Sequence, residues 1–346
     1  MQRADIVILT ALRIEFEAVR DHLADVHSVV HPRGTQYEIG NFQAAGVSLR
    51  VAIVQTGAGN AGAAVECERA IAYFEPRTVL FVGVAGGLKD IAIGDVVIGT
   101  KVYAYHSGKV TDSFNPRPEV GTSSYSLVQL ASAVGRADSW QRRIRVAPKR
   151  KPRALVAPIA AGEEVVASIN SDTYAFLKAN YGDACAIEME GAGFLRAAYA
   201  NESVRKTVIR GISDLVDKKE AADATGSQPI AAAHAAAFAF ELIAADGSLS
   251  ISGQSEAATQ NDPANWAELE RIVAELYPLG PRDNEIWRRA GGDLSVLELG
   301  SSGRATWHSA LRTLRLGGGG AGITLSRILH EIKSDFPNHE ELKRLK

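Results

Sequence analysis

The sequence has few cysteines, no long hydrophobic run and almost no net charge, and each absence excludes a class of protein. Its two cysteines, Cys67 and Cys185, give neither a disulfide framework nor a cluster of metal ligands, so a cytoplasmic location fits best. The N-terminal residues MQRAD lead at once into a strand-like run, so we expect no signal peptide. The short hydrophobic runs predict no membrane span. A formal net charge of -2 gives no reason to expect a nucleic-acid partner.

What the sequence does contain is an alternation of two kinds of segment. Near-continuous runs of apolar and β-branched residues predict buried strands at Asp5–Thr10, Arg50–Thr56, Thr78–Val84, Asp95–Thr100, Ala154–Ala160, Ala184–Glu188 and Lys206–Ile212. Helical patterns lie between them, at Arg13–Leu23, Gly59–Phe74, Ser123–Val134, Asp172–Asn180, Ala192–Ala200 and Pro229–Ala244. Such an alternation is typical of an α/β sandwich with a mostly parallel or mixed sheet.

The character of the chain changes after residue 245. Residues 246–265 are small and polar, which predicts a flexible linker. Beyond them only helical patterns follow, at Trp266–Leu276, Asp283–Ala290, Thr306–Leu314 and Ile323–Phe336. We therefore expect one domain over residues 1–245, a linker over 246–265 and a small all-α domain over 266–346.

Three acidic residues follow three of the predicted strands. Glu15 lies in the helix after the first strand, Glu190 follows the sixth and Asp214 follows the seventh. Ligands of open α/β sheets bind outside the carboxyl ends of the strands, so these carboxylates can converge on one cleft. Each also has a structural interpretation: Glu15 would favour a helix N-terminus, Glu190 could cap a helix and Asp214 could cap a turn.

Four motifs place these residues in the context of a family. They are ILTALRIEFEAVRDHL (Ile8–Leu23), VGVAGGL (Val82–Leu88) followed by IGDVVIGT (Ile93–Thr100), IEMEGAG (Ile187–Gly193) and VIRGISDLVD (Val208–Asp217). In order and spacing they resemble the nucleoside phosphorylase and nucleosidase superfamily over roughly residues 4–244. Within it, the chain looks most like the methylthioadenosine/S-adenosylhomocysteine nucleosidases.

The resemblance implies a three-layer α/β/α sandwich with a central mixed sheet, no metal or cofactor, and a task for each residue. Glu190 would accept hydrogen bonds from the ribose 2′- and 3′-hydroxyls, and Met189 would pack against the sugar. Asp214, positioned by Ser213, would protonate the purine N7. Glu15 would orient the attacking water. The sugar and base pocket would be lined by Ala85, Gly86, Val165 and Val166.

The chemistry of glycosidic cleavage agrees with these tasks. A purine protonated at N7 leaves as a neutral base while the sugar passes through an oxocarbenium-like state. The acid must carry its proton, and burial can raise the pKa of a carboxyl group. A second carboxylate can activate water and stabilise the cationic sugar. We therefore predict hydrolysis of the N-glycosidic bond of an adenine nucleoside or nucleotide, giving free base and sugar or sugar phosphate.

Two alternatives remain open at this point. Phosphorylases of the superfamily bind phosphate with arginine and a hydroxyl residue near the glycine-rich turn. Val84 offers no hydroxyl there, and the Thr10–Leu12 turn lacks glycine, which favours water as nucleophile; Arg13 keeps a phosphorylase possible. The other alternative is a nucleoside-sensing module without turnover, which the presence of all three carboxylates disfavours.

Two departures from the small nucleosidases put the substrate in doubt. Val165 stands where their base-stacking segment usually carries an aromatic residue. The chain is also enlarged around His106–Ser124 and Arg136–Arg153, and the second insertion contains the basic stretch Arg142–Arg153. That stretch is either a solvated surface loop or a cationic rim for a phosphorylated substrate such as AMP or ATP.

The C-terminal segment carries a second resemblance. ELERIVAELYP (Glu268–Pro278), IWRRAGG (Ile286–Gly292), Trp307 and FPNHEEL (Phe336–Leu342) look like the effector-associated domains of bacterial conflict systems. The resemblance implies an adaptor that recruits a protein partner in anti-phage defence. We expect the tryptophans Trp266, Trp287 and Trp307 to be core residues of this domain. Members of the nucleosidase family are usually dimers or larger, so we also expect a homo-oligomer.

Overall fold

The structure is a computed structural model that describes residues 3–44, 46–216, 226–261, 263–298, 300, 302–315, 318–320 and 322–344. The chain forms two compact units, Met1–Ser248 and Leu249–Lys346, which we name the N-terminal unit and the C-terminal unit. Each unit has a hydrophobic core of its own.

A mixed ten-stranded sheet forms the centre of the N-terminal unit in the described part of the chain. Its strands are β1 (Ile6–Thr10), β2 (Ala24–Val30), β3 (Gln36–Ala44), β4 (Val47–Gln55), β5 (Thr78–Gly87), β6 (Val96–Ala104), β9 (Glu119–Thr122), β10 (Ala154–Ala161), β11 (Ala186–Glu188) and β12 (Arg205–Leu215). The seven strands predicted from apolar runs are all confirmed. The sequence did not predict β2, β3 and β9, because none of them has a continuous apolar run: β2 and β9 are mostly exposed, and β3 alternates apolar and polar residues. A separate hairpin pairs β7 (Gly108–Val110) with β8 (Phe114–Pro116).

The strand order brings several carboxyl ends together. The order is β11-β10-β6-β12-β5-β1-β4-β3-β2, with β9 paired to β6. Strands β4, β1, β5 and β12 run parallel, and β6 is antiparallel to β12. β11 pairs with β10 and also with the end of β5, at Gly86 and Gly87. The sheet therefore curls back on itself, and the ends of β5, β11 and β12 meet.

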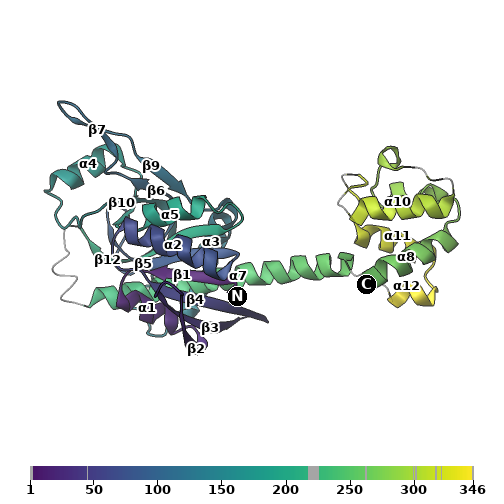
Figure 1. The fold of residues 1–346 in the computed structure, drawn as a ribbon, viewed down its shortest axis with the longest axis horizontal. Coiled ribbons are helices and arrows are strands. Elements are labelled where there is room, and N and C mark those ends of the chain that lie inside the picture. The colour runs from purple at the N-terminus through teal and green to yellow at the C-terminus, as the bar shows by residue number, and fades with distance from the viewer. Residues whose placement is uncertain are drawn as a thin grey trace. The chain divides into compact units, whose positions relative to one another are not determined.

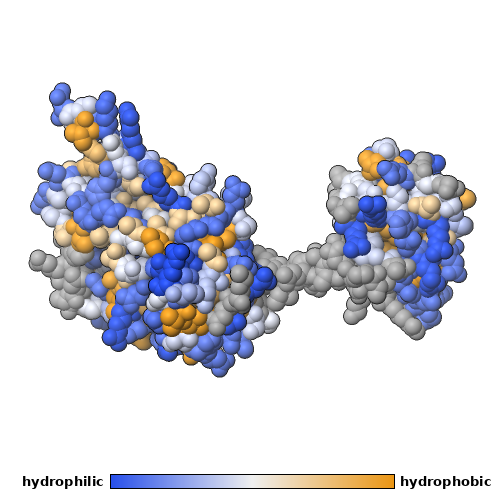
Figure 2. All heavy atoms as spheres, viewed as in Figure 1, coloured by the Kyte–Doolittle hydropathy of each residue, from blue (hydrophilic) through white to orange (hydrophobic). Residues whose placement is uncertain are grey.

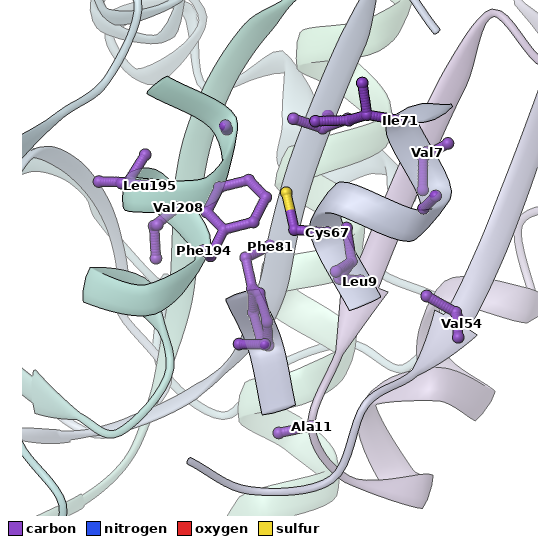
Figure 3. Close-up of a cluster of buried hydrophobic side chains, with 14 of the residues drawn as sticks. Val7, Leu9, Ala11, Val54, Cys67, Ile71, Phe81, Phe194, Leu195 and Val208 are labelled. Carbon is purple, nitrogen blue, oxygen red and sulfur yellow. The ribbon is translucent and has the colours of Figure 1, made fainter. Parts of the chain in front are cut away.

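Helices cover both faces of this sheet. α2 (Asn60–Phe74) and α5 (Gly191–Tyr199) pack on one face, and α1 (Arg13–Arg20), α3 (Tyr125–Ala137) and α7 (Ser227–Asn261) pack on the other (Figure 1). Figure 3 shows the first core, where Cys67 of α2 and Phe194 of α5 lie close to Phe81 of β5. The three layers confirm the predicted α/β/α sandwich. Two further short helices are α4 (Asp172–Asn180) and the 3-10 helix η1 (Ser139–Arg143).

Helix α7 is longer than the sequence predicts. Its Ser227–Gly247 part is long and apolar enough to cross a membrane, but 78 % of that hydrophobic window is buried inside the structure. Ala235, Phe238 and Phe240 pack in the core against the sheet, so this part is a core helix. The helix then continues through Asn261, where the composition predicts a flexible linker. Alanine, glutamine and glutamate, which this segment contains, are good helix formers, and an isolated glycine costs a helix only about 1 kcal/mol relative to alanine. Residue 262 of that segment lies outside the described residues.

The described residues of the C-terminal unit form helices joined by turns, and none of them forms a strand. Its elements are α8 (Pro263–Leu276), η2 (Asp283–Glu285), α9 (Ile286–Arg289), η3 (Leu294–Val296), α10 (Gly303–Arg315), α11 (Leu325–Asp335) and α12 (Glu340–Arg344). Trp266, Trp287 and Trp307 are buried in its core, as predicted. The indole N–H groups of Trp287 and Trp307 donate to backbone carbonyls at 3.0 Å, which satisfies them inside the core. The face of the unit visible in Figure 2 is mainly hydrophilic.

Candidate active site

A cavity of about 220 Å³ opens at the carboxyl ends of β1, β5, β11 and β12. It is lined by Ala11, Leu12, Glu15, Ala58, Val84, Ala85, Gly86, Glu164, Val165, Val166, Ile187, Glu188, Met189, Glu190, Ser213, Asp214 and Gln228. The nine residues that the sequence predicts for the site are all in this lining: Glu15, Ala85, Gly86, Val165, Val166, Met189, Glu190, Ser213 and Asp214. The fold thus brings the nine candidates together, although they come from five separate segments.

Other parts of the described chain offer less chemistry. A larger cavity of about 540 Å³ is lined by Asn60, His106, Glu163, Arg196 and neighbouring residues, but by none of the three predicted carboxylates. No group of three or more His, Cys, Asp or Glu side chains in the described residues could hold a metal ion. We therefore place the candidate active site in the smaller cavity.

Glu15 is buried and held by three backbone N–H groups. The amides of Ala11 and Leu12 donate to its Oε2 at 2.7 and 2.9 Å, and the amide of Val84 donates to its Oε1 at 2.7 Å. Burial raises the pKa of Glu15, while Arg210 and these hydrogen bonds oppose the rise. An ionised carboxylate has about four acceptor positions, so one remains for a ligand.

Arg210 lies fully buried at the centre of an ionic network. Its Nη2 donates to Glu188 Oε2 and, at 3.1 Å, to Glu190 Oε2. Burial lowers the pKa of Arg210, but Glu188 and Glu190 raise it by more, so the guanidinium stays charged. Gly83 makes room for this arrangement, because a Cβ there would collide with the Arg210 guanidinium and the Glu15 carboxylate.

Glu188 and Glu190 stand at the start of α5. Glu188 accepts hydrogen bonds from the backbone N–H groups of Glu190 and Gly191, and burial raises its pKa against the opposing effect of Arg210. Glu190 accepts from the Gly59 amide at Oε1, at 3.0 Å, and from Arg210 at Oε2. Each oxygen of Glu190 therefore keeps one further acceptor position.

Asp214 reaches the cavity through an irregularity in β12. The pairing of β12 with β5 shifts register between Ile212 and Asp214, and such bulges re-aim side chains next to active sites. Asp214 is 3 % exposed, and Gly86 leaves the space beside its Oδ1 open. Ser213 Oγ lies 2.8 Å from Asp214 Oδ2 and 3.4 Å from the Ala85 carbonyl oxygen. A hydroxyl can donate or accept, so it can bond Asp214 in either protonation state.

The expected absence of a stacking aromatic is visible in the lining of the cavity. Val165 is 59 % exposed at the edge, and Val166 is buried beside it. Met189 lines the same cavity. Among the described lining residues there is no aromatic side chain, so a base would contact aliphatic groups.

The basic stretch Arg142–Arg153 contributes nothing to this lining. Arg150 and Arg153 instead pair with the buried carboxylate of Asp95, at the start of β6. Their side chains remain about half exposed. The structure favours the surface-loop interpretation of this stretch over the cationic rim.

Besides apolar lining residues, sequence reasoning missed the polar residues Arg210, Glu188 and Gln228 in or beside the site. The first two carry a usable signal, because each is a charged residue inside a run that predicts a buried strand, and a buried charge needs a partner. Gln228 carries none. It reaches the cavity only because the fold places the first turn of α7 there.

Comparison with known proteins extends this description. The chain is 28 % identical over 216 residues to the 5′-methylthioadenosine/S-adenosylhomocysteine nucleosidase of Haemophilus ducreyi, which covers 61 % of this chain and 85 % of that protein. It is 24 % identical over 213 residues to the nucleosidase of the same name from Listeria monocytogenes, covering 61 % and 87 %.

Solved structures show the same fold. The 5′-methylthioadenosine/S-adenosylhomocysteine nucleosidase of Neisseria meningitidis, in complex with methylthio-immucillin-A, matches with a TM-score of 0.56 at 25 % identity, covering 69 % of this chain and 98 % of that one. Futalosine hydrolase of Helicobacter pylori matches with a TM-score of 0.56 at 22 % identity, covering 70 % and 97 %. The family profile described as the phosphorylase superfamily matches residues 5–244. The chain therefore belongs to the phosphorylase superfamily.

Proposed function

We propose that the N-terminal unit is a purine nucleosidase that hydrolyses the N-glycosidic bond of an adenine nucleoside, with a nucleotide as the alternative substrate. The observation that carries the proposal is the convergence of Glu15, Glu190 and Asp214 on one cavity from the ends of three strands. Membership of the phosphorylase superfamily and the nucleosidases among its relatives support it.

Asp214 is the proposed general acid. Its carboxyl group would donate a proton to N7 of the purine as the bond between C1′ and N9 breaks, so that adenine leaves uncharged. Ser213 would hold the carboxyl group in either protonation state, and the open space at Gly86 would admit the edge of the base. Proton transfer from a positioned acid typically contributes about 10²–10⁴-fold in rate.

Glu190 and Glu15 would act on the sugar and the water. The two remaining acceptor positions of Glu190 suit the 2′- and 3′-hydroxyls of ribose, which Met189 would support from one side. The one remaining acceptor position of Glu15 suits a water molecule, whose proton it would take as the oxygen bonds to C1′. Both carboxylates would also stabilise positive charge on the sugar.

Water is favoured over phosphate as the nucleophile. A phosphate dianion needs charge-assisted donors, and no lysine or arginine is among the described residues that line the cavity. Arg13 was the residue that left the phosphorylase interpretation possible. It points to solvent with 83 % of its side chain exposed and pairs with Glu17 at 2.7 Å. Arg210 is engaged by Glu188 and Glu190.

The test is chromatography of the products formed from adenosine, methylthioadenosine, AMP, ATP, dATP and inosine, each with and without phosphate. We expect free adenine without phosphate. Release that requires phosphate would make the protein a phosphorylase. If the protein binds these compounds but releases no adenine, under conditions in which a related nucleosidase is active, only the interpretation as a nucleoside-sensing module would remain.

We further propose that the C-terminal unit is an adaptor that links this activity to a protein partner in anti-phage defence. Its own tryptophan-rich core and its resemblance to effector-associated domains support this role. Plaque counts on cells that carry the wild-type chain or Asp214→Asn would test it. We expect more plaques with the variant, and equal counts would remove the defence role.

We also propose that the protein works as a homo-oligomer in the cytoplasm. Val65 of α2 and Tyr199 of α5 are 55 % and 75 % exposed, and burial of these apolar side chains against a second copy would be favourable. Cys67 and Cys185 are free and buried, as suits a reducing compartment. Analytical ultracentrifugation would decide the first point, since a monomer at all concentrations would contradict it.

A further inference from the structure

The side chain of Asn60, the first residue of α2, joins two other segments of the N-terminal unit. Its Oδ1 accepts a hydrogen bond from the backbone N–H of Gly193 in α5 at 2.9 Å. Its Nδ2 donates to the carbonyl oxygen of Gly162 and to Oε1 of Glu163, both at 2.9 Å. An amide group has two donor hydrogens and an acceptor oxygen, so Asn60 uses both donors and its oxygen. It therefore ties α2 to α5 and also to the segment that follows β10.

These contacts border the candidate active site on two sides. On one side, the neighbouring backbone N–H of Gly59 donates to Oε1 of Glu190 at 3.0 Å. On the other side, residues 163–166 belong to neither a helix nor a strand, and three of them line the cavity. Asn60 lines the larger neighbouring cavity and not this one. A ligand in the candidate active site would therefore touch what Asn60 holds in place, but not Asn60 itself.

The junction fixes α2 and α5 more firmly than the segment after β10. A Cβ at Gly193 would lie 2.0 Å from the Asn60 carbonyl oxygen, so the two helices meet backbone to backbone. Gly162 is held at the end of β10, where its N–H donates to the Glu188 carbonyl oxygen at 3.0 Å. Residues 163–166 lie beyond that strand, and side-chain contacts such as the one with Asn60 order them. A segment ordered in this way opens at a low cost in free energy.

We propose that Asn60 is a positioning residue, which holds residues 163–166 at a fixed distance from Glu190 and so sets the width of the active site. The inference rests on the proposed function, in which Glu190 binds the ribose hydroxyls and Val165 and Val166 line the position of the base. A site that is already ordered binds its ligand without a further loss of conformational entropy. When the segment is released, that loss is added to the cost of binding, and the base is held less tightly.

The experiment removes the donors of Asn60 and leaves its oxygen in place, in the full-length protein. Asn60→Asp keeps an oxygen for the N–H of Gly193 but sets a carboxylate against Glu163, and the first turn of a helix tolerates a carboxylate. The double variant Asn60→Asp, Glu163→Gln reverses donor and acceptor. The new amide at position 163 can then donate to the carboxylate at position 60, so the contact is restored while the new charge at position 60 stays.

Asn201→Asp is the matched control. Asn201 follows α5, and its Nδ2 donates to Oε2 of Glu68 in α2 at 2.7 Å, outside the lining of the candidate active site. The same replacement there creates the same contact between two carboxylates at the other end of these helices. A general loosening of α2 against α5 would therefore appear in both variants, and a loss of positioning in Asn60→Asp alone.

For each protein, kcat and KM are measured for adenine release from adenosine and from methylthioadenosine, and Kd is measured for adenine alone by titration calorimetry. We expect Asn60→Asp to raise KM and the Kd for adenine about tenfold. We expect kcat to fall by less than about threefold, since lost binding raises KM and leaves kcat nearly unchanged. A loss of folded protein would instead lower the apparent kcat without a change in KM. The double variant should recover most of both values, and Asn201→Asp should leave them unchanged.

Three results would overturn the inference. They are an unchanged KM and Kd in Asn60→Asp, equal rises in Asn201→Asp, and no recovery in the double variant, which would assign the effect to the charge at position 60. If the wild type binds adenine but releases none from either nucleoside, the proposed function fails, and the Kd values alone support or overturn the role of Asn60. A wild type that does not bind adenine overturns both.

Discussion

The N-terminal unit buries charge, whereas the C-terminal unit keeps charge at its surface. Arg210 is 0 % exposed and Glu15 2 % exposed in the first, while the core of the second consists of apolar and aromatic side chains. The arginine Arg289 of the second unit pairs with Glu331 and Asp335 at its surface. A buried charge lowers stability unless it is paired and hydrogen-bonded, and an apolar replacement is often more stable. The N-terminal unit thus keeps buried charges that stability alone does not favour, as the proposed binding and catalysis would require, whereas the charged pair described in the C-terminal unit lies at its surface.

The largest expected effect is on catalysis, in Asp214→Asn. The amide keeps the shape of the side chain and can still bond Ser213, but it has no acidic proton for the purine. We expect kcat for adenine release to fall about 10²–10⁴-fold, with little change in Tm. The same replacement in the other unit, Asp335→Asn, is the control and should leave kcat unchanged. Adenine release at the wild-type rate by Asp214→Asn would exclude Asp214 as the acid.

The next largest effect is on stability, in Arg210→Met. Removal of the guanidinium leaves Glu188 and Glu190 buried without their cation, and broken buried pairs typically lose about 3–5 kcal/mol. Urea unfolding, monitored by hydrogen exchange of the backbone amides of the N-terminal unit, would measure the loss of unfolding free energy. The triple variant Arg210→Met, Glu188→Gln, Glu190→Gln removes the stranded charges and should recover part of it. Unfolding of Arg210→Met at the wild-type urea concentration would show that the network contributes little.

The sequence allowed prediction of what depends on local pattern. Continuous apolar runs located seven strands, because strands covered on both faces are apolar at every position. Glu15, Glu190 and Asp214 were chosen as candidates because ligands of open α/β sheets bind outside the carboxyl ends of the strands. The ionic network around Arg210 was not predicted from the sequence. The partner of a buried charge is set by the strand order, which brings β11 and β12 to the two sides of β5.

Two further features depend on the fold in the same way. Composition indicated a linker after residue 245, but a segment of small polar residues is compatible with helix, and α7 extends to Asn261. The basic stretch was compatible with a surface loop and with a rim for phosphate, and the structure favours the surface loop because Arg150 and Arg153 pair with Asp95, a contact that sequence alone does not show. Pairing across a fold decides whether a cation is available to a ligand.

The contributions of Glu15 and Asp335 to stability should depend on pH with opposite signs. Burial raises the pKa of Glu15 above the usual 4.5, so its contribution to stability is fully present below pH 4.5 and is lost as pH rises through the raised pKa. The free energy of unfolding of the wild type minus that of Glu15→Gln should therefore decrease as pH rises, by about 1.4 kcal/mol per unit of pKa change. If Glu15 activates water, kcat/KM should rise over the same range.

Asp335 is the control for the sign of this pH dependence of stability. A hydrogen bond from Arg289 lowers its pKa below 3.8, so its contribution is present above pH 3.8 and is lost as pH falls through the lowered pKa. The difference between the wild type and Asp335→Asn should accordingly decrease on acidification. A Glu15 difference that instead grows with pH would mean that its hydrogen bonds outweigh burial.

The smallest expected effect is in Arg289→Met, which removes the surface pairs of the C-terminal unit. Arg289 is about a third exposed, as is Glu331, and such pairs typically contribute about 1 kcal/mol or less. Tryptophan fluorescence can follow this unit, since it contains three of the four tryptophans of the chain. We expect a small loss of stability that shrinks further with added salt, and unchanged adenine release. A loss of unfolding free energy as large as that of Arg210→Met would contradict this expectation, because surface ion pairs typically contribute little to stability. Arg289 would then be part of a structured charged site, and a ligand or partner of the C-terminal unit would have to be sought for that site.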